Sequence, residues 1–203
     1  MLGVDAARVL YLSQVHGRAA RFYRTQEVRT DLITLEGDAL GGTEPGSAYG
    51  VRSADCVPIL LADTESGAVM AIHAGWRGVV VGVVEAGVAC LRQNLGGEGR
   101  LLAAIGPHIS KLAFEVSDDV AQQLAACPGS GAGALTRADP SAKPHVDLRW
   151  IVTQKLLALG LTEASIDAES TSGCTVLMPD RYFSFRRDGK RSGRHLSAIV
   201  PRP

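Results

Sequence analysis

Apolar and polar residues alternate along several short stretches of the chain, and this pattern predicts β-strands. Residues 8–16 alternate in part, and residues 101–105 form a short apolar run. Alternation places every second side chain on the same face of a strand, which indicates a sheet with a buried face. Further strands are predicted at 165–171, 182–185 and 196–200.

A β-hairpin is predicted in the first third of the chain. The apolar runs at 49–63 and 68–74 are separated by four residues of turn-forming composition. If the last residue of the first run pairs with the first residue of the second, His73 lies opposite Pro58. Cys56 is then a diagonal neighbour of His73 on the same face of the sheet.

Two longer segments are predicted to be helices. Residues 79–95 are apolar on all sides and too numerous for a strand, so we expect a buried helix, weakened by Gly82 and Gly87. Residues 148–159 have an amphipathic helical pattern that ends at Gly160. A shorter helix is predicted from Ser117 to Ala126, and the Gly-rich segments 36–50 and 127–144 are predicted to be loops.

The mixture of strands and helices predicts the α/β or α+β class. The chain has 46% apolar and 21% charged residues, which is typical of globular proteins and excludes disorder as the main state. Lysine plus arginine and aspartate plus glutamate both total 21. Nucleic-acid binders and polybasic membrane anchors need an excess of positive charge, so neither partner is expected.

The N-terminus lacks the basic and apolar regions of a signal peptide, and no run of about 18 apolar residues is present. We therefore expect a cytoplasmic protein without a membrane span. In that reducing compartment the four cysteines are expected to be buried residues, ligands or nucleophiles rather than two disulfides.

The hairpin brings a cysteine and a histidine together. Diagonal Cβ atoms on a sheet lie about 7–8 Å apart, so the thiolate of Cys56 and the imidazole of His73 can reach one zinc ion between them. The alternative is a small apolar core cysteine next to a hydrogen-bonded histidine. Both interpretations remain open at this point.

The residues after His73 suggest an anion site. Gly75-Trp76-Arg77-Gly78 joins the strand to the predicted helix, and glycine allows close approach of the backbone. A helix starting near Val79 would direct free N–H groups at an anion, and the planar guanidinium of Arg77 suits phosphate. Gly75, Arg77 and Gly78 are therefore candidate phosphate-binding residues. The alternative is a tight turn with a surface arginine.

Three blocks of sequence resemble the YfiH family, also called the laccase-domain or multicopper polyphenol oxidase family. They are Gln14-Val15-His16-Gly17, Ser53-Ala54-Asp55-Cys56-Val57-Pro58 and His73-Ala74-Gly75-Trp76-Arg77-Gly78. Blocks at 104–107, 114–116, 174–175 and 183–187 follow in the order of the family. The match covers nearly the whole chain, which implies one domain over residues 1–203 that lacks the N-terminal segment usual in the family.

The resemblance implies a zinc site formed by His16, Cys56 and His73. It also implies a two-sheet sandwich with outer helices, similar to the catalytic domain of cytotoxic necrotizing factor. The implied activity is phosphorolysis of adenosine, inosine, guanosine and methylthioadenosine, together with adenosine deamination. Purine nucleoside and phosphate would be the partners. Related proteins are also described as peptidoglycan editing factors.

Three protein ligands leave one position of a four-coordinate zinc open, as in catalytic sites. Asp55 and Arg77 are the candidate catalytic residues. Arg77 would bind phosphate, and Asp55 would transfer a proton or orient a metal ligand. The alternative for Asp55 is a purely structural hydrogen bond. Cysteine and histidine ligands also suit copper, but the chain has five histidines and no His-x-His pair, which argues against a multicopper oxidase. Two other hypotheses remain: a cysteine hydrolase with Cys56 as nucleophile and His73 as base, and a non-enzymatic module.

Overall fold

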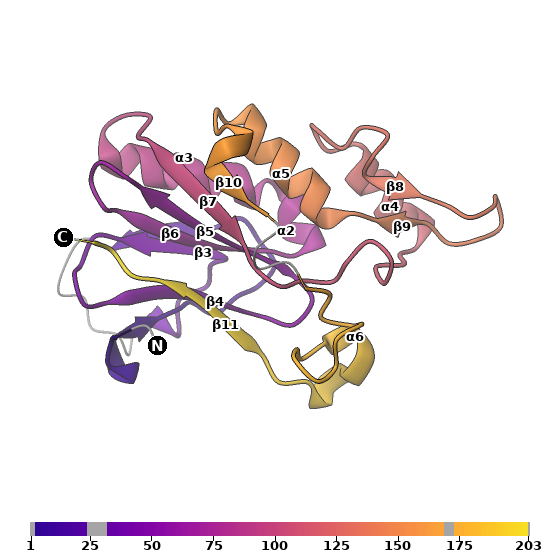
Figure 1. Cartoon of the computed structure of the whole chain (residues 1–203), viewed down its shortest axis with the longest axis horizontal. Helices are drawn as coiled ribbons and strands as arrows, with labels where there is room; N and C mark the ends of the chain where they lie inside the picture. The colour runs from indigo at the N-terminus through magenta and orange to yellow at the C-terminus, as the bar shows by residue number, and fades with distance from the viewer. Residues whose placement is uncertain (1–2, 24–31, 169–172, 203) are drawn as a thin grey trace.

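A six-stranded mixed sheet lies in the middle of the molecule (Figure 1), with the strand order β10-β7-β5-β6-β3-β2. The structure is a computed structural model that describes residues 3–23, 32–168 and 173–202. The outermost pairs, β10 with β7 and β2 with β3, are parallel, and the inner pairs are antiparallel. The strands of this sheet are β2 (Ala20–Tyr23), β3 (Ala39–Gly42), β5 (Val57–Asp63), β6 (Val69–Ala74), β7 (Leu101–Ile105) and β10 (Ile166–Asp167).

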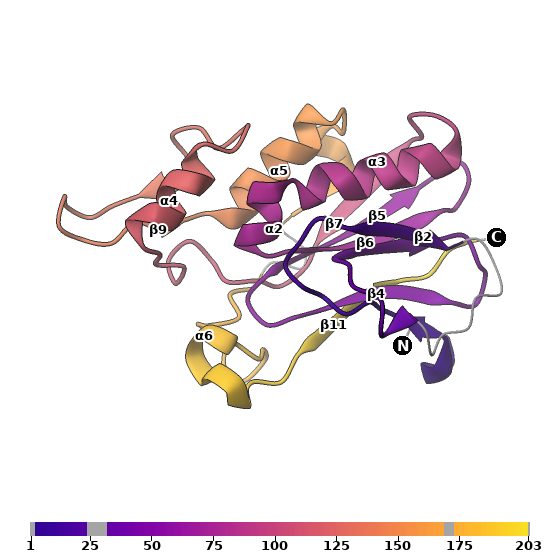
Figure 2. The same cartoon turned by 180° about the vertical axis from the view of Figure 1, so that it is seen from behind.

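A smaller sheet covers one face of the central sheet. It has the order β1-β4-β11, and Figure 2 shows it on the side of the central sheet opposite the helices. A separate apolar cluster includes Leu40 and Val69 from the large sheet and Tyr49 from the small one, all buried. The strands of the small sheet are β1 (Val9–Leu10), β4 (Ala48–Ser53) and β11 (His195–Ile199).

Helices α3 and α5 cover the other face and enclose the larger core. Ile59 and Ile72 from the sheet, Val88 from α3 and Ile151 from α5 are fully buried in it. The layers are therefore helices, large sheet and small sheet, which confirms the predicted sandwich with outer helices. The helices are α2 (Trp76–Val81), α3 (Val83–Leu95), α4 (Asp118–Ala125), α5 (Leu148–Ala158) and α6 (Phe185–Asp188), with 3₁₀ turns η1 (Ala6–Arg8), η2 (Glu163–Ser165) and η3 (Gly189–Arg191) and a small hairpin of β8 (Leu135–Thr136) and β9 (His145–Val146).

The predicted hairpin is present with the predicted register. Strands β5 and β6 are antiparallel, and Pro58 pairs with His73. The apolar run at 49–63, however, is two strands that belong to different sheets. The chain breaks between them at Asp55, whose backbone has a φ of 96°, in the left-handed region that redirects the chain. This break separates β4 from β5 directly before Cys56.

The predicted helix over 79–95 is two helices. Gly82 takes a left-handed conformation with a φ of 89° and ends α2 before α3 begins. The first helix also starts at Trp76, three residues before the predicted start. The second begins directly after this glycine, whose left-handed conformation an L-residue rarely adopts.

Several predicted boundaries are wrong. The segment 36–50, predicted as a loop, contains β3 and the start of β4. The segment 182–185 is not a strand, because the side chain of Ser184 accepts a hydrogen bond from the Arg187 N–H and caps α6. The strand predicted at 8–16 is paired over β1, with one isolated bridge at Ser13. Of the strand predicted at 165–171, β10 forms the first part, and residues 169–171 lie outside the described residues.

The described ranges contain no helix that is long and apolar enough to cross a bilayer.

Candidate metal centre

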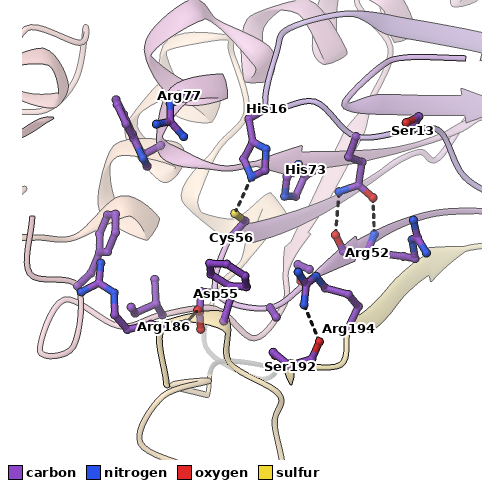
Figure 3. Close-up of a pocket in the computed structure, with 17 residues that line it drawn as sticks. Ser13, His16, Arg52, Asp55, Cys56, His73, Arg77, Arg186, Ser192 and Arg194 are labelled. Carbon is purple, nitrogen blue, oxygen red and sulfur yellow. Dashed lines mark hydrogen bonds between the residues drawn. The ribbon is translucent and has the colours of Figure 1, made fainter. Parts of the chain in front are cut away.

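Three side chains from distant parts of the sequence meet at one end of the inner strands β5 and β6 of the central sheet (Figure 3). His16 lies in the loop before β2, Cys56 directly precedes β5, and His73 lies near the end of β6. One ligand atom of each lies within 4.8 Å of the others. Ligand atoms bound tetrahedrally to one zinc lie roughly 3.4–3.6 Å apart, and the His16 Nε2 to Cys56 Sγ distance is 3.8 Å. The group therefore needs little rearrangement to hold one ion.

A buried carboxylate fixes the geometry of both histidines. Asp38 accepts a hydrogen bond from His73 Nδ1 at 2.8 Å. It also accepts from the backbone N–H groups of His16 at 3.0 Å and Gly17 at 2.7 Å. These bonds hold the loop that carries His16, whose φ is +58°. Because Nδ1 of His73 is used, its Nε2 remains for a metal, which is the carboxylate–histidine arrangement common in zinc sites.

The electrostatics of the group favour a thiolate. Burial alone would raise the pKa of the Cys56 thiol, but its hydrogen bonds with His16 and His73 outweigh this effect and lower the pKa to about 7. Burial would lower the pKa of His73, but the hydrogen bonds to Asp38 and Cys56 raise it to about 9. Burial would likewise raise the pKa of Asp38, and its hydrogen bonds with His73 and Gly17 lower it. A deprotonated sulfur is the form that binds a metal.

Gly75 allows the ligands to approach the backbone. A Cβ at this position would lie 2.7 Å from Cδ2 of His16 and 3.1 Å from Sγ of Cys56. Gly78 lies in the first turn of α2, buried, where a Cβ would come within 3.1 Å of the Gly17 carbonyl oxygen. Neither glycine lines the pocket described below. Their observed contacts are therefore with the ligand-bearing loops.

The three candidate ligands line a pocket of about 710 Å³. Arg77 lies at its edge, exposed, with its guanidinium 4.7 Å from the centre of the Trp76 ring. Three further arginines line the same pocket, and no pattern in the sequence grouped them beforehand. The remaining lining residues are mostly small, polar or aromatic; the arginines are Arg52, Arg186 and Arg194.

Asp55 also lines the pocket, but its carboxylate is already used. One oxygen accepts from the Thr175 hydroxyl and the other from the Arg186 backbone N–H, both at 2.6 Å. Its backbone carbonyl accepts from Ile109 N–H. Asp55 thus ties the residue before Cys56 to the C-terminal segment that forms one wall of the pocket.

Sequence reasoning missed Asp38, because this residue lies in the Gly-rich run that was predicted to be a loop. A signal was present: Asp38 directly precedes the apolar pair Ala39-Leu40. A carboxylate directly before a buried strand is a candidate partner for a buried histidine.

A sequence model of the family described as "Multi-copper polyphenol oxidoreductase laccase" matches residues 1–202. The chain belongs to this family. A relative in it, named purine nucleoside phosphorylase, from Bacteroides thetaiotaomicron, is 36% identical over 164 residues, which is 80% of this chain and 60% of that protein. This chain thus spans less than two thirds of the length of that relative. Adenosine deaminase RL5, from an unknown prokaryotic organism, is 34% identical over 98% of this chain and 77% of its own length.

Solved structures of the family have the same fold. The YfiH protein of Bacillus licheniformis, described as hypothetical, superimposes with a TM-score of 0.86 at 25% identity, over 99% of this chain and 77% of that one. YlmD of Geobacillus stearothermophilus has a TM-score of 0.84 at 28% identity, over 97% and 74% of the two chains. Membership in the YfiH family, expected from the sequence blocks, is confirmed.

The donor set bears on the metal that the family description suggests. A multicopper oxidase holds a mononuclear and a trinuclear copper centre, which together need many imidazole ligands. The chain has five histidines, and two of them, His16 and His73, already belong to the group at Cys56. His108 and His145 bond to backbone carbonyls. One thiolate with two imidazoles matches a mononuclear metal site with an open position, and this donor set suits zinc and also a single copper ion.

Proposed function

We propose that this chain is a zinc-dependent purine nucleoside phosphorylase. In the reaction the bond between C1′ of the ribose and N9 of the purine breaks, and an oxygen of phosphate bonds to C1′. The base leaves with the bonding electrons and takes up a proton. The observation that carries the proposal is the presence of a Cys/His₂ ligand group inside a pocket lined by arginines. The name of the Bacteroides relative supports it.

His16, Cys56 and His73 would hold the zinc through Nε2, Sγ and Nε2. Bound there, the ion supplies a Lewis acid next to the substrate. The residues of the chain position the metal ligands and the substrate. Asp38 keeps the proton of His73 on Nδ1, and the lowered pKa of Cys56, about 7, makes the metal-binding thiolate accessible at neutral pH.

Arg77 would bind the attacking phosphate. Its guanidinium lies over the Trp76 ring, and this cation–π contact restricts its orientation. A planar fork of donors suits two phosphate oxygens at once. Gly75 and Gly78, predicted as backbone donors to phosphate, would contribute by letting the loops pack closely instead.

Asp55 would act as a positioning residue and not in proton transfer. Both of its oxygens accept short hydrogen bonds, one from Thr175 and one from Arg186, and these bonds hold the carboxylate in the pocket wall. Its role would be to hold the pocket wall against the segment that carries Cys56.

Adenosine deamination is the second proposed activity. The same pocket and the same ion would serve it, since replacement of the 6-amino group by oxygen needs an activated water and a proton donor. The name of the RL5 relative supports this activity.

The test is a comparison of metal content and activity in three proteins. Wild-type protein is expected to hold about one zinc and to convert inosine and phosphate into hypoxanthine. C56A is expected to lose both the metal and the activity. C90A is the matched control, because Cys90 lies on α3 outside the pocket.

Two results would decide against the proposal. Zinc-replete protein that forms no hypoxanthine from inosine is not a phosphorylase of this substrate. Metal-free wild-type protein that hydrolyses an amide, and loses this activity on alkylation of Cys56, would instead support the cysteine hydrolase, for which the lowered thiol pKa is also suited.

A further inference from the structure

The pocket carries more positive charge than one attacking phosphate requires. Four arginines line it: Arg52, Arg77, Arg186 and Arg194. Asp55 is the carboxylate in its lining, and both of its oxygens are engaged in other hydrogen bonds. Across the part of the chain that the structure describes, no ion pair joins any of the four to an acidic side chain. The charge is therefore available to a ligand.

Two of these arginines lie at the small sheet, Arg52 within β4 and Arg194 directly before β11. Strands β4 and β11 are antiparallel, and Arg52 pairs with Leu196. Arg194 lies two residues before Leu196 and so falls on the same face as Arg52, as its diagonal neighbour. Both line the pocket. The small sheet thus presents a pair of guanidinium groups.

Aromatic rings and carbonyls orient this pair. The guanidinium of Arg52 lies 4.7 Å from the centre of the Tyr11 ring, and that of Arg194 lies 5.4 Å from the Phe185 ring. Arg194 Nη1 also donates to the carbonyl of Ser192 at 2.9 Å. These contacts reduce the entropy that binding would cost the two side chains.

The pair is separate from Arg77. Figure 3 shows Arg77 on one side of Cys56, and Arg52 and Arg194 on the other. Their positions in the fold differ, since Arg77 belongs to α2, whereas Arg52 belongs to β4 and Arg194 directly precedes β11. A ligand that reaches across the metal group would therefore meet one cationic site at each end.

We propose that Arg52 and Arg194 form a second anion subsite, which binds the 5′-phosphate of a purine nucleoside 5′-monophosphate. This rests on the proposed phosphorolysis, in which Arg77 holds the attacking phosphate. The C1′–N9 bond breaks and a C1′–O bond to inorganic phosphate forms. The purine leaves with the electron pair and takes the proton that the phosphate gives up, so the products are the free base and ribose 1,5-bisphosphate. The pocket volume of about 710 Å³ falls within the range of ligand sites.

The experiment compares inosine with inosine 5′-monophosphate as substrates of the zinc-loaded full chain. We expect a higher kcat/KM for the nucleotide. In R52Q and R194Q the ratio of the two kcat/KM values should fall about tenfold or more, because a charge-assisted hydrogen bond is lost. R181Q is the matched control: Arg181 also stacks on an aromatic ring but does not line the pocket, so the ratio should stay unchanged.

Two outcomes would overturn the proposal. One is a ratio that is the same in wild type and in both pocket variants. The other is a rise in KM for inorganic phosphate in R52Q with inosine as the substrate, which would mean that the pair holds the attacking phosphate.

A failure of the phosphorylase hypothesis can be told apart from a failure of the subsite. If neither substrate is cleaved, calorimetry measures binding of the two compounds to the zinc-loaded protein. Tighter binding of the nucleotide that is weakened about tenfold in R52Q supports the subsite. Equal binding of nucleoside and nucleotide refutes it.

Discussion

Replacement of Asp38 by asparagine is the sharpest test of how the metal centre is held. One carboxylate oxygen accepts from the His16 N–H and from His73 Nδ1, and the other accepts from the N–H groups of Gly17 and Val15. An amide turns one acceptor into a donor. Whichever way the amide points, the two hydrogen bonds at one of its ends are lost or must reverse direction.

Both orientations of the amide damage the centre. If its NH₂ group faces Gly17, the loop that carries His16 loses its anchor. If the NH₂ group faces His73, Nδ1 must accept, and the imidazole proton moves to Nε2, where it blocks a metal. Hydrogen bonds to a charged group contribute about 1.5–3 kcal/mol each, so the loss of one or two predicts a fall of about 1.5–6 kcal/mol in the free energy of unfolding. Loss of a partner of this kind also weakens metal binding about 10–100-fold.

Asp63 provides the matched control for this variant. It is another buried aspartate, and it accepts from Ser66 N–H, from the Ser66 hydroxyl and from Arg100 N–H. It lies at the turn end of the β5–β6 hairpin, away from the metal centre. D63N should therefore lose stability in urea denaturation but keep the zinc affinity measured by chelator competition. A folded D38N protein with the zinc affinity of wild type would refute the reasoning.

Three more predictions follow from single contacts. G75A should lose about tenfold or more in zinc affinity, because its Cβ would lie 2.7 Å from the ring of His16. G97A is the control, because a Cβ at Gly97 has no neighbour within 4 Å. An equal loss of zinc affinity in both variants would contradict the prediction. Burial would raise the pKa of Asp63, but its hydrogen bonds lower it in the folded protein. Asp63 therefore stabilises the fold above its pKa in the unfolded chain, about 4, and this stabilisation is lost as the pH falls through its lower pKa in the folded protein. As the pH is lowered below about 4, the free energy of unfolding measured in urea should fall more steeply for wild type than for D63N. Parallel plots of this free energy against pH would disprove the prediction. T175V removes the hydroxyl that donates to Asp55, and we expect kcat/KM to fall about tenfold with the zinc content unchanged; an unaltered kcat/KM would argue against a positioning role.

The hairpin was the part of the site most open to prediction. Its register depends on the turn length and on the alternation within two adjacent runs, and both are local properties of the sequence. The pairing of Pro58 with His73 was therefore predicted, and it places Cys56 and His73 at the same edge. The position of His16 beside them was implied by family resemblance alone, since nothing local links it to the hairpin.

Other features depend on backbone conformation that the pattern does not encode. Residues 49–63 form a largely apolar run that Arg52, Ser53 and Asp55 interrupt where β4 ends, and a short polar interruption does not by itself show that the chain changes sheets. The break comes from Asp55, a residue with positive φ that is neither glycine nor asparagine. Hydrogen bonds from Thr175 and Arg186 hold it, and these partners are 120 and 131 residues away in sequence.

The sequence by itself determined the class of the fold and the hairpin that brings Cys56 near His73, because periodicity and turn composition act over a few residues; the full ligand set was implied by the family resemblance. The tertiary structure alone decided that Asp38 orients both histidines and that arginines from α2, β4, α6 and the segment before β11 share one pocket. These groups are brought together by the packing of two sheets and a helical layer, and a one-dimensional pattern carries no information on which distant segments will become neighbours in that packing.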